Sequence, residues 1–464
     1  MTAPTTASAE SAESAAPSGE SAVHQWFEDL ADATFGRLEA GEELHLSFGG
    51  EDTDFVRFNG GSIRQAGSIR QRQVELDLIE GLRHTRASVE LSGDLATDAA
   101  QIADIVAMLR SQRAAVPEDP YLLLPEGAST SHHVADATLP DPDEIVDRIT
   151  AAGSGIDAAM VGVYAAGRTR SGFAGSAGQR HWYSAASFDL DWSFHLHADV
   201  SSKHRHAGVA WDDDAFAAAV ASARTQLEVL ARPAVTLDPG GYRTLLAPAA
   251  LAELIDLLSW GGFGIQARQT RETPLLHLID GTDSFSPMVS FTEDTAGGVA
   301  PPFNEDGFVR PPAVPLVIEG RAGDALVSPR SAQEFGVPTN GASSWEAPES
   351  FAMAPGTLAA ADALAALGTG LSVGNLWYTN YSDRSACRIT GMTRFATFWV
   401  EDGELVAPVS VLRFDDTLYR LLGDRLEALT DRAELILDSS TYESRSTGSL
   451  RVPGALVSEM TYTL

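Results

Sequence analysis

Four histidines in one short stretch form the densest set of potential metal ligands in the chain. They are His195, His197, His204 and His206. On a strand, residues i and i+2 share a face, so a turn at residues 201–203 would bring four imidazoles together across a hairpin. Imidazoles and carboxylates bind transition metals, and three aspartates are nearby: Asp189, Asp191 and Asp199. A metal site is one hypothesis, and exposed histidines on a polar strand are the alternative.

A second possible reactive group is Cys387, the only cysteine of the chain. A thiol beside a cation such as Arg388 can have a lowered pKa and act as a nucleophile. The alternative is a cysteine that is simply packed inside a β segment. A single cysteine excludes an intramolecular disulfide and a cysteine-rich metal cluster.

Residues 375–414 combine aromatic side chains with threonine and arginine. An Asp-Gly turn at residues 401–404 separates two stretches of β-forming residues, which predicts a hairpin. Strands of this composition can present a rigid polar surface, although the aromatic residues would also suit a core. The candidate contact residues for a peptide or partner are Tyr378, Tyr381, Arg384, Thr390, Thr393 and Arg394.

The same segment resembles the C-terminal signature of the TldD/PmbA family of peptidase-like proteins. In that signature Asn-Leu-Trp-Tyr precedes Thr-Gly-Met-Thr-Arg and a strand–turn–strand hairpin, as at residues 375–378, 390–394 and 401–404 here. Other parts of the chain are similar to further family elements, in the same order: residues 57–65, 303–307 and 331–341. The resemblance extends from about Trp26 to the C-terminus.

The resemblance implies where zinc would bind in an active family member. There, the helix that opens the C-terminal domain carries His-Glu-x-x-x-His, two zinc ligands and a general base. The corresponding helix here, residues 249–258, contains no histidine, and its carboxylates Glu253 and Asp256 suit a solvated face. Cys387 lies in a different segment from the family's ligand cysteine. The resemblance therefore points to the metal-free PmbA/TldE branch, with no cofactor in this chain and zinc in a TldD-like partner.

The resulting expectation is a TldE/PmbA-like, non-catalytic subunit of a metallopeptidase complex. The resemblance implies that its N-terminal domain dimerises and that its C-terminal domain helps to bind or admit unstructured peptides. Strand addition would suit such peptides, because it needs only a sheet edge and side-chain pockets. Two alternatives stay open: a homodimeric peptide-binding protein without catalysis, and an independent hydrolase that uses the four histidines or Cys387.

Hydrophobic periodicity predicts an α+β protein with two domains. Residues 1–21 are expected to be a disordered tail, residues 22–232 an α+β domain with an antiparallel sheet, and residues 233–464 a β-dominated, barrel-like or sandwich-like domain. Helices are predicted at residues 21–39, 95–113, 143–152, 215–231, 248–260 and 359–367. Strands are predicted at residues 43–48, 54–58, 69–79, 82–91, 158–166 and 242–246. From residue 273 onwards the sequence otherwise indicates strands and loops.

The charge balance is strongly acidic, with 64 acidic and 32 basic residues. A net charge of −32 repels nucleic acids and anionic membranes, so neither is an expected partner. No apolar run reaches the roughly 18–20 residues that a membrane-spanning helix needs. The first residues lack the basic and apolar regions of a secretory signal, so a cytoplasmic location is expected.

Overall fold

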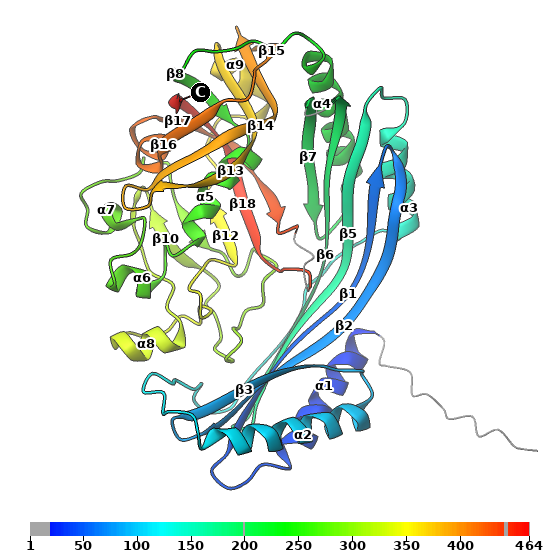
Figure 1. The fold of residues 1–464 in the computed structure, drawn as a ribbon, viewed down its shortest axis with the longest axis vertical. Helices are drawn as coiled ribbons and strands as arrows, with labels where there is room; N and C mark the ends of the chain where they lie inside the picture. The colour runs from blue at the N-terminus through cyan, green and yellow to red at the C-terminus, as the bar shows by residue number, and fades with distance from the viewer. Residues whose placement is uncertain (1–18, 198–199, 440–443, 464) are drawn as a thin grey trace, which may run out of the picture.

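The computed structural model describes residues 19–197, 200–439 and 444–463 and contains two sheets, each in its own domain (Figure 1). A 7-stranded sheet forms the N-terminal domain, and an 11-stranded sheet forms the C-terminal domain. The mixed α+β class is as the sequence predicts. The predicted tail lies largely outside the described residues, and the first helix begins at Glu20.

The N-terminal sheet has the order β3-β2-β1-β5-β6-β4, with β7 also paired to β6. Its strands are β1 (Glu43–Asn59), β2 (Ser62–Glu80), β3 (Arg83–Glu90), β4 (Ser129–Val134), β5 (Ala159–Gly175), β6 (Gln179–His197) and β7 (Val200–Gly208). All pairs are antiparallel except the β4–β6 pair. The antiparallel hairpins follow the chain order, as expected for strands joined by short turns.

Strand β1 is one continuous element, so the prediction of two separate strands at residues 43–48 and 54–58 is wrong. The intervening residues Gly49 to Asp54 are paired to β2 on one side and to β5 on the other. Their polar character arises because the middle of the sheet has no apolar core to face. Backbone hydrogen bonds on both sides hold the strand extended without one.

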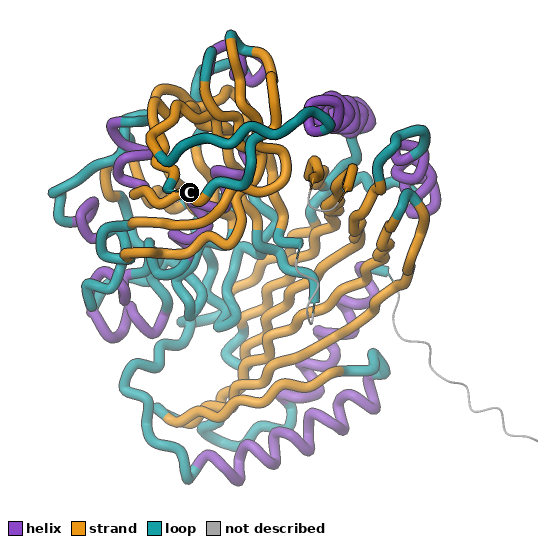
Figure 2. The backbone as a smooth tube through the Cα atoms, turned by 45° about the horizontal axis from the view of Figure 1, so that its top comes forward, coloured by secondary structure: helices purple, strands orange, loops and turns teal. Residues whose placement is uncertain are grey.

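Four helices cover the two ends of this sheet (Figure 2). Helices α1 (Glu20–Phe35) and α2 (Leu95–Arg113) pack at one end, and α3 (Pro142–Gly153) and α4 (Asp213–Leu230) pack at the other. Helix α2 has the predicted bounds, and the Asp94 side chain caps it by accepting a hydrogen bond from Thr97 N. Within the described ranges, no helix is long and apolar enough to cross a membrane.

The C-terminal domain is rich in strands, as predicted, and five strands of its sheet close into a ring, so that of the two predicted forms it is the barrel-like one. They are β8 (Gly240–Leu246), β13 (Gly370–Asp383), β14 (Arg388–Glu401), β16 (Arg413–Thr417) and β18 (Ser449–Tyr462). Closure occurs because β8 pairs with both β13 and β18. The remaining strands are β9 (Phe291–Glu293), β10 (Val314–Ile318), β11 (Arg321–Ala322), β12 (Ser350–Met353), β15 (Glu404–Pro408) and β17 (Leu426–Leu437).

The helices of this domain are short. They are α5 (Pro248–Ile255), α6 (Ile265–Gln269), α7 (Leu276–Ile279), α8 (Pro329–Phe335) and α9 (Ala363–Leu367), with single turns η1 (Asp256–Ser259), η2 (Ala360–Asp362) and η3 (Arg420–Asp424). The sequence prediction misses α6, α7 and α8. Helix α8 nevertheless has clear signals: Ser328 is its N-cap, Pro329 occupies the first turn, and Gly336 ends it at φ 66°.

Two apolar contacts fix the C-terminal domain against the N-terminal domain. Ala396 and Phe398 of β14 belong to the core beneath α4, and Phe303 packs with Phe173 and Tyr183 of the N-terminal sheet. Figure 1 shows the C-terminal domain beside β5, β6 and β7, with β18 leading from the side of these strands up to the C-terminus. The domains therefore face each other across a defined interface.

A buried ion-pair cluster ties the start of β1 to the end of α2. Glu42 accepts hydrogen bonds from Arg110 Nη2 at 2.7 Å and from Arg113 Nη1 at 2.8 Å. The Glu42 side chain is almost completely buried, and its hydrogen bonds to Arg110 lower its pKa to about 2. The ionised carboxylate is therefore matched by two cations.

We predict that Glu42→Gln lowers the free energy of unfolding by roughly 2–3 kcal/mol at pH 7, because it leaves two arginines without their partner. The folded pKa lies below the unfolded value of about 4.3, so this stabilisation is present above about pH 4.3 and is lost as the pH falls towards 2. Urea unfolding at several pH values measures it. Glu39→Gln is the control, since Glu39 is exposed and lies 3.7 Å from the same Arg110. Equal effects of the two variants would contradict the prediction.

Candidate functional site

The four histidines do not converge on one point. Strands β6 and β7 pair so that His204 lies opposite Trp192 and His206 opposite Leu190, while His195 lies opposite Ser201. Residues 201–203 are part of β7, so the turn predicted there is wrong. Asp199 lies outside the described residues. No group of three or more His, Cys, Asp or Glu residues is close enough to hold a metal in the part of the chain that the structure describes.

His204 and His206 instead belong to an aromatic core under α4. His204 stacks on Trp192 at 5.1 Å, and burial lowers its pKa to about 4. His206 packs edge-on against Trp211 at 4.6 Å. The i, i+2 pattern identifies a shared face correctly, but that face is covered by a helix.

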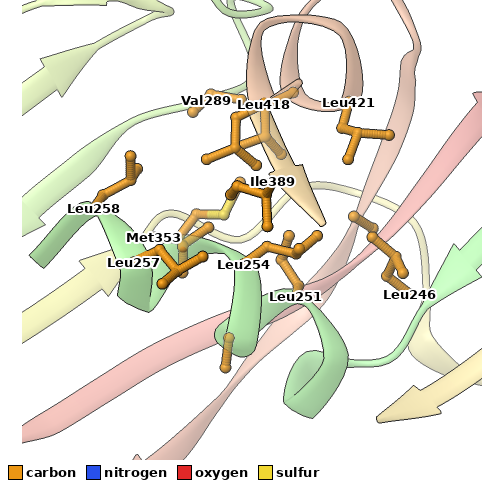
Figure 3. Close-up of a cluster of buried hydrophobic side chains, with 14 of the residues drawn as sticks. Leu246, Leu251, Leu254, Leu257, Leu258, Val289, Met353, Ile389, Leu418 and Leu421 are labelled. Carbon is orange, nitrogen blue, oxygen red and sulfur yellow. The ribbon is translucent and has the colours of Figure 1, made fainter. Parts of the chain in front are cut away.

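Helix α5, on which the sequence resemblance leads one to look for zinc ligands, is an apolar core helix. Leu251 and Leu254 on α5, with Leu257 and Leu258 on η1, point into a cluster with Met353 and Ile389 (Figure 3). Glu253 and Asp256 lie on the exposed side of the same segment. Surrounding atoms of the same chain displace part of the water around these carboxyls, and this desolvation raises the pKa of both.

Cys387 is fully buried in the C-terminal core. Burial raises the pKa of its thiol to about 12, which outweighs the opposing effect of Arg384. The thiolate needed for nucleophilic attack is therefore absent near neutral pH. The structure gives Cys387 a packing role.

The two domains meet around a cluster of charged side chains, which we call the interdomain cluster. Its carboxylates are Glu51, Asp189, Asp191, Glu253, Asp256 and Asp438, and its cations are Lys203, Arg205 and Arg445. Lys203 and Arg205 of β7 both reach Asp191 Oδ2, at 3.0 and 3.1 Å. These residues come from five separate segments of the chain, so only the folded protein brings them together.

Arg445 anchors the segment before β18 to the N-terminal sheet. Its backbone N–H donates to Glu51 Oε2 at 2.9 Å. Its guanidinium donates to Ser187 Oγ at 2.8 Å and to the carbonyl oxygens of Ser187 and Gly167. The acceptors of the guanidinium are neutral, so Arg445 does not neutralise a carboxylate by direct contact.

Asp189 on β6 is the least satisfied member of this cluster. It is only 6% exposed, and its Oδ1 has no hydrogen-bond partner among the described residues. Burial raises its pKa to about 6, opposed by Arg205, Arg445 and Lys203. A buried carboxylate oxygen without a donor is costly, so a water molecule or another hydrogen-bond donor at this position would stabilise it.

A small recess lies next to this carboxylate. It has a volume of about 20 Å³ and is partly open. It is lined by Val163 and Ala165 of β5, by Asp189 and Asp191 of β6, and by Asp438, Ser439 and Arg445. This space is enough for one water-sized group.

The six predicted contact residues divide into three structural groups. Tyr381 and Arg384 hold the segment after α5: the Tyr381 hydroxyl donates to the carbonyl of Leu257 at 2.8 Å, and Arg384 donates to the carbonyls of Glu272 and Trp260. Thr390 and Thr393 instead bond to the neighbouring strand. Thr390 donates to the carbonyl of Phe414, and Thr393 accepts from Leu412 N.

Tyr378 and Arg394 form the third group, in which the Tyr378 side chain is open to solvent. Tyr378 is 78% exposed beside Trp377, which is 49% exposed. Arg394 lies over the Trp377 ring at 4.8 Å, and Lys203 of the N-terminal domain lies over the Phe395 ring at 5.6 Å. This aromatic–cation surface therefore adjoins the interdomain cluster.

The backbone around this surface is irregular. Tyr378 and Phe395 have φ values of 56° and 59°, which are uncommon for bulky residues, and both fall at register shifts between β13 and β14. Beyond Val373, β13 has β14 as its only strand neighbour among the described residues. The outer half of β13 is consequently an open sheet edge that carries exposed aromatic side chains.

Sequence reasoning missed the interdomain cluster as a site. The available signal was the Asp-Leu-Asp alternation at residues 189–191, which places two carboxylates on one strand face. From the sequence, Asp189 and Asp191 were considered only as possible metal ligands beside the four histidines. Nothing local in the sequence connects them with Glu51 or Arg445, more than a hundred residues away on either side.

We predict that Asp189→Asn raises the free energy of unfolding by roughly 2 kcal/mol at pH 7.5, because it removes an unpaired buried charge. The folded pKa of about 6 lies above the unfolded value of about 3.9, so the wild type loses stability as the pH rises through this window. The variant should not lose stability over this pH range, and the free energies of unfolding of the two proteins should become equal near pH 4. Urea unfolding between pH 4 and 8 measures this, with Asp424→Asn as the exposed control. A variant less stable than the wild type at pH 7.5 would contradict the prediction.

Comparison with known proteins gives one family model and several solved structures. Residues 239–464 match the model described as the PmbA/TldA metallopeptidase C-terminal domain. The structure is similar to TldE from Thermococcus kodakarensis, with a TM-score of 0.77 and 14% identity over 95% of this chain and 100% of that chain. No curated protein matches the sequence.

Two further solved structures share the fold. One is a putative modulator of a DNA gyrase from Thermotoga maritima, with a TM-score of 0.74 and 14% identity over 94% of this chain and 100% of that chain. The other is a putative modulator of DNA gyrase from Bacteroides thetaiotaomicron, with a TM-score of 0.69 and 15% identity over 95% of this chain and 98% of that chain. The fold extends across both domains, and the family model covers the C-terminal one. Residues 239–464 therefore belong to the PmbA/TldD family by their sequence, and the whole chain shares the fold of TldE.

Proposed function

We propose that this chain is the metal-free, TldE-like subunit of a TldD/PmbA-type metallopeptidase assembly. In this role it binds unstructured peptides at the face between its two domains and presents them to a zinc-bearing, TldD-like partner. The observation that carries the proposal is the composition of α5. A helix that holds zinc needs two histidines one turn apart on an accessible face, and the residues of α5 are apolar apart from Glu253.

The peptide-binding part of the proposal is supported by β13. An extended peptide can add to an open sheet edge through backbone hydrogen bonds, without a defined sequence, and side-chain pockets then set preference. The outer half of β13 offers such an edge, and Trp377 and Tyr378 offer large apolar contact area beside it. Exposed aromatic residues on a strained backbone are typical of binding surfaces rather than of cores.

We predict that this protein co-purifies with a His-Glu-x-x-x-His paralogue from the same genome when both are co-expressed, and that zinc follows the partner. Metal analysis should give about one zinc for each partner chain and none for this chain purified alone. Peptidase activity should require both chains. Conversion of the partner's glutamate to glutamine should abolish activity without separating the complex.

Two results would contradict that prediction. Stoichiometric zinc in the isolated chain, lost on His197→Ala, would favour an independent metalloenzyme. A stable homodimer that ignores the zinc-bearing paralogue would favour a peptide-binding protein without catalysis.

We also predict that Tyr378→Gly weakens binding of an unstructured peptide by about five- to thirtyfold, as expected when an aromatic anchor worth 1–2 kcal/mol is removed. Glycine accepts the positive φ of this position, so the melting temperature should not fall. Fluorescence anisotropy with a labelled peptide measures the affinity. Trp345→Ala is the control, because Trp345 is 86% exposed in the loop between α8 and β12. Unchanged affinity of the Tyr378 variant would show that the peptide does not use this edge.

A further inference from the structure

The recess beside Asp189 has the properties of a binding site for one small group. Asp189 is more than nine-tenths buried, lines the recess, and has an Oδ1 without a donor among the described residues. The ligand must therefore donate a hydrogen bond to a carboxylate. At about 20 Å³ the space accepts a group the size of a water molecule.

The charge around the recess favours a cation. The interdomain cluster contains six carboxylates and three cations. Lys203 and Arg205 are both directed at Asp191, and the Arg445 guanidinium is directed at neutral acceptors. Among the described residues, Asp189 has no cation at hydrogen-bond distance, and it is the buried carboxylate that lines the recess with an oxygen lacking a donor.

The volume of the recess and the residues that line it limit which class of cation can bind there. A guanidinium is planar and far larger than one water, and a divalent metal needs several oxygen ligands around it. In the described ranges no three carboxylate, imidazole or thiolate residues are arranged for a metal. A primary ammonium is compact, is positively charged and carries three donors.

We propose that this recess binds the primary ammonium group of an extended peptide, either its N-terminal α-ammonium or the Nζ of a lysine, with Asp189 Oδ1 as the principal acceptor. The Ser439 side chain and Asp438 at the rim supply further acceptors. The inference rests on the proposed peptide-binding function and specifies which peptides that function favours.

The position of the recess fits a peptide that lies along β13. Asp191 lines the recess and binds Lys203, and Lys203 in turn lies over Phe395 on β14. Phe395 also contacts Arg394, whose guanidinium covers Trp377 next to the open edge. A continuous series of contacts therefore joins the ammonium site to the strand edge.

The test compares three labelled peptides of one unstructured sequence on the full chain at pH 7.5. The first has a free N-terminus and no lysine, the second is N-acetylated without lysine, and the third is N-acetylated with one internal lysine. We expect acetylation to weaken binding by about ten- to hundredfold, as for loss of a hydrogen bond to a charged group. Recovery of affinity in the third peptide would show that lysine is also accepted; failure to recover would restrict the site to the N-terminus.

Asp189→Asn should reduce binding of the free-amine peptide to the level of the acetylated peptide and leave the acetylated peptide unchanged. Asp424→Asn removes one exposed carboxylate and should preserve the difference. A second measurement needs no variant. Methylammonium should compete with the free-amine peptide, whereas tetramethylammonium, which has no N–H donor, should not compete at equal ionic strength.

Different results would contradict the ammonium site alone or the ammonium site together with peptide binding. Equal binding of the free-amine and acetylated peptides would overturn the ammonium site and leave peptide binding intact. Binding of neither peptide would overturn both. Equal competition by the two ammonium ions, or loss of the preference when Mg²⁺ or Zn²⁺ is added, would also overturn the assignment.

Discussion

The backbone pairing in the middle of the N-terminal sheet is the constraint on which the rest of the structure depends. There β1 lies between β2 and β5 along its length, while the helices and their apolar cores lie at the two ends. The ladder hydrogen bonds, not side-chain packing, keep this region extended. A polar wall results, and it holds Glu51, Ser187 and Asp189 at fixed positions towards the C-terminal domain.

The apolar contacts and the charged contacts between the domains have different roles. Apolar packing at Phe398 and at Phe303 sets how the domains lie against each other. The charged groups between the domains are therefore not needed to stabilise this interface. Charges enclosed in this way reduce stability unless each has a partner. Their retention beside an open strand edge is better explained by recognition than by folding.

The sequence was sufficient for the α+β class, for helix α2 and for the hairpin between β14 and β15, because each depends on local periodicity or turn chemistry. The sequence was misleading where tertiary contacts determine the conformation of a segment or the burial of a side chain. Gly49 to Asp54 resemble a loop but form a strand, since both neighbours pair with them. His204 and His206 share a face as expected, yet α4 covers it, and His195 lies on the opposite face of the sheet. Asp189 and Arg445 form one site only after some 250 residues of intervening chain have folded, which no local pattern records.

The use of arginine for nearly every positive charge has a practical consequence. Lys203 is the only lysine in the sequence, and it projects from β7 between Asp191 and the ring of Phe395. Reagents that acylate side-chain amines therefore have a single target in this protein, and it lies beside the recess. The rate at which that one amine reacts would report directly how open the space between the domains is in solution, without any engineered label.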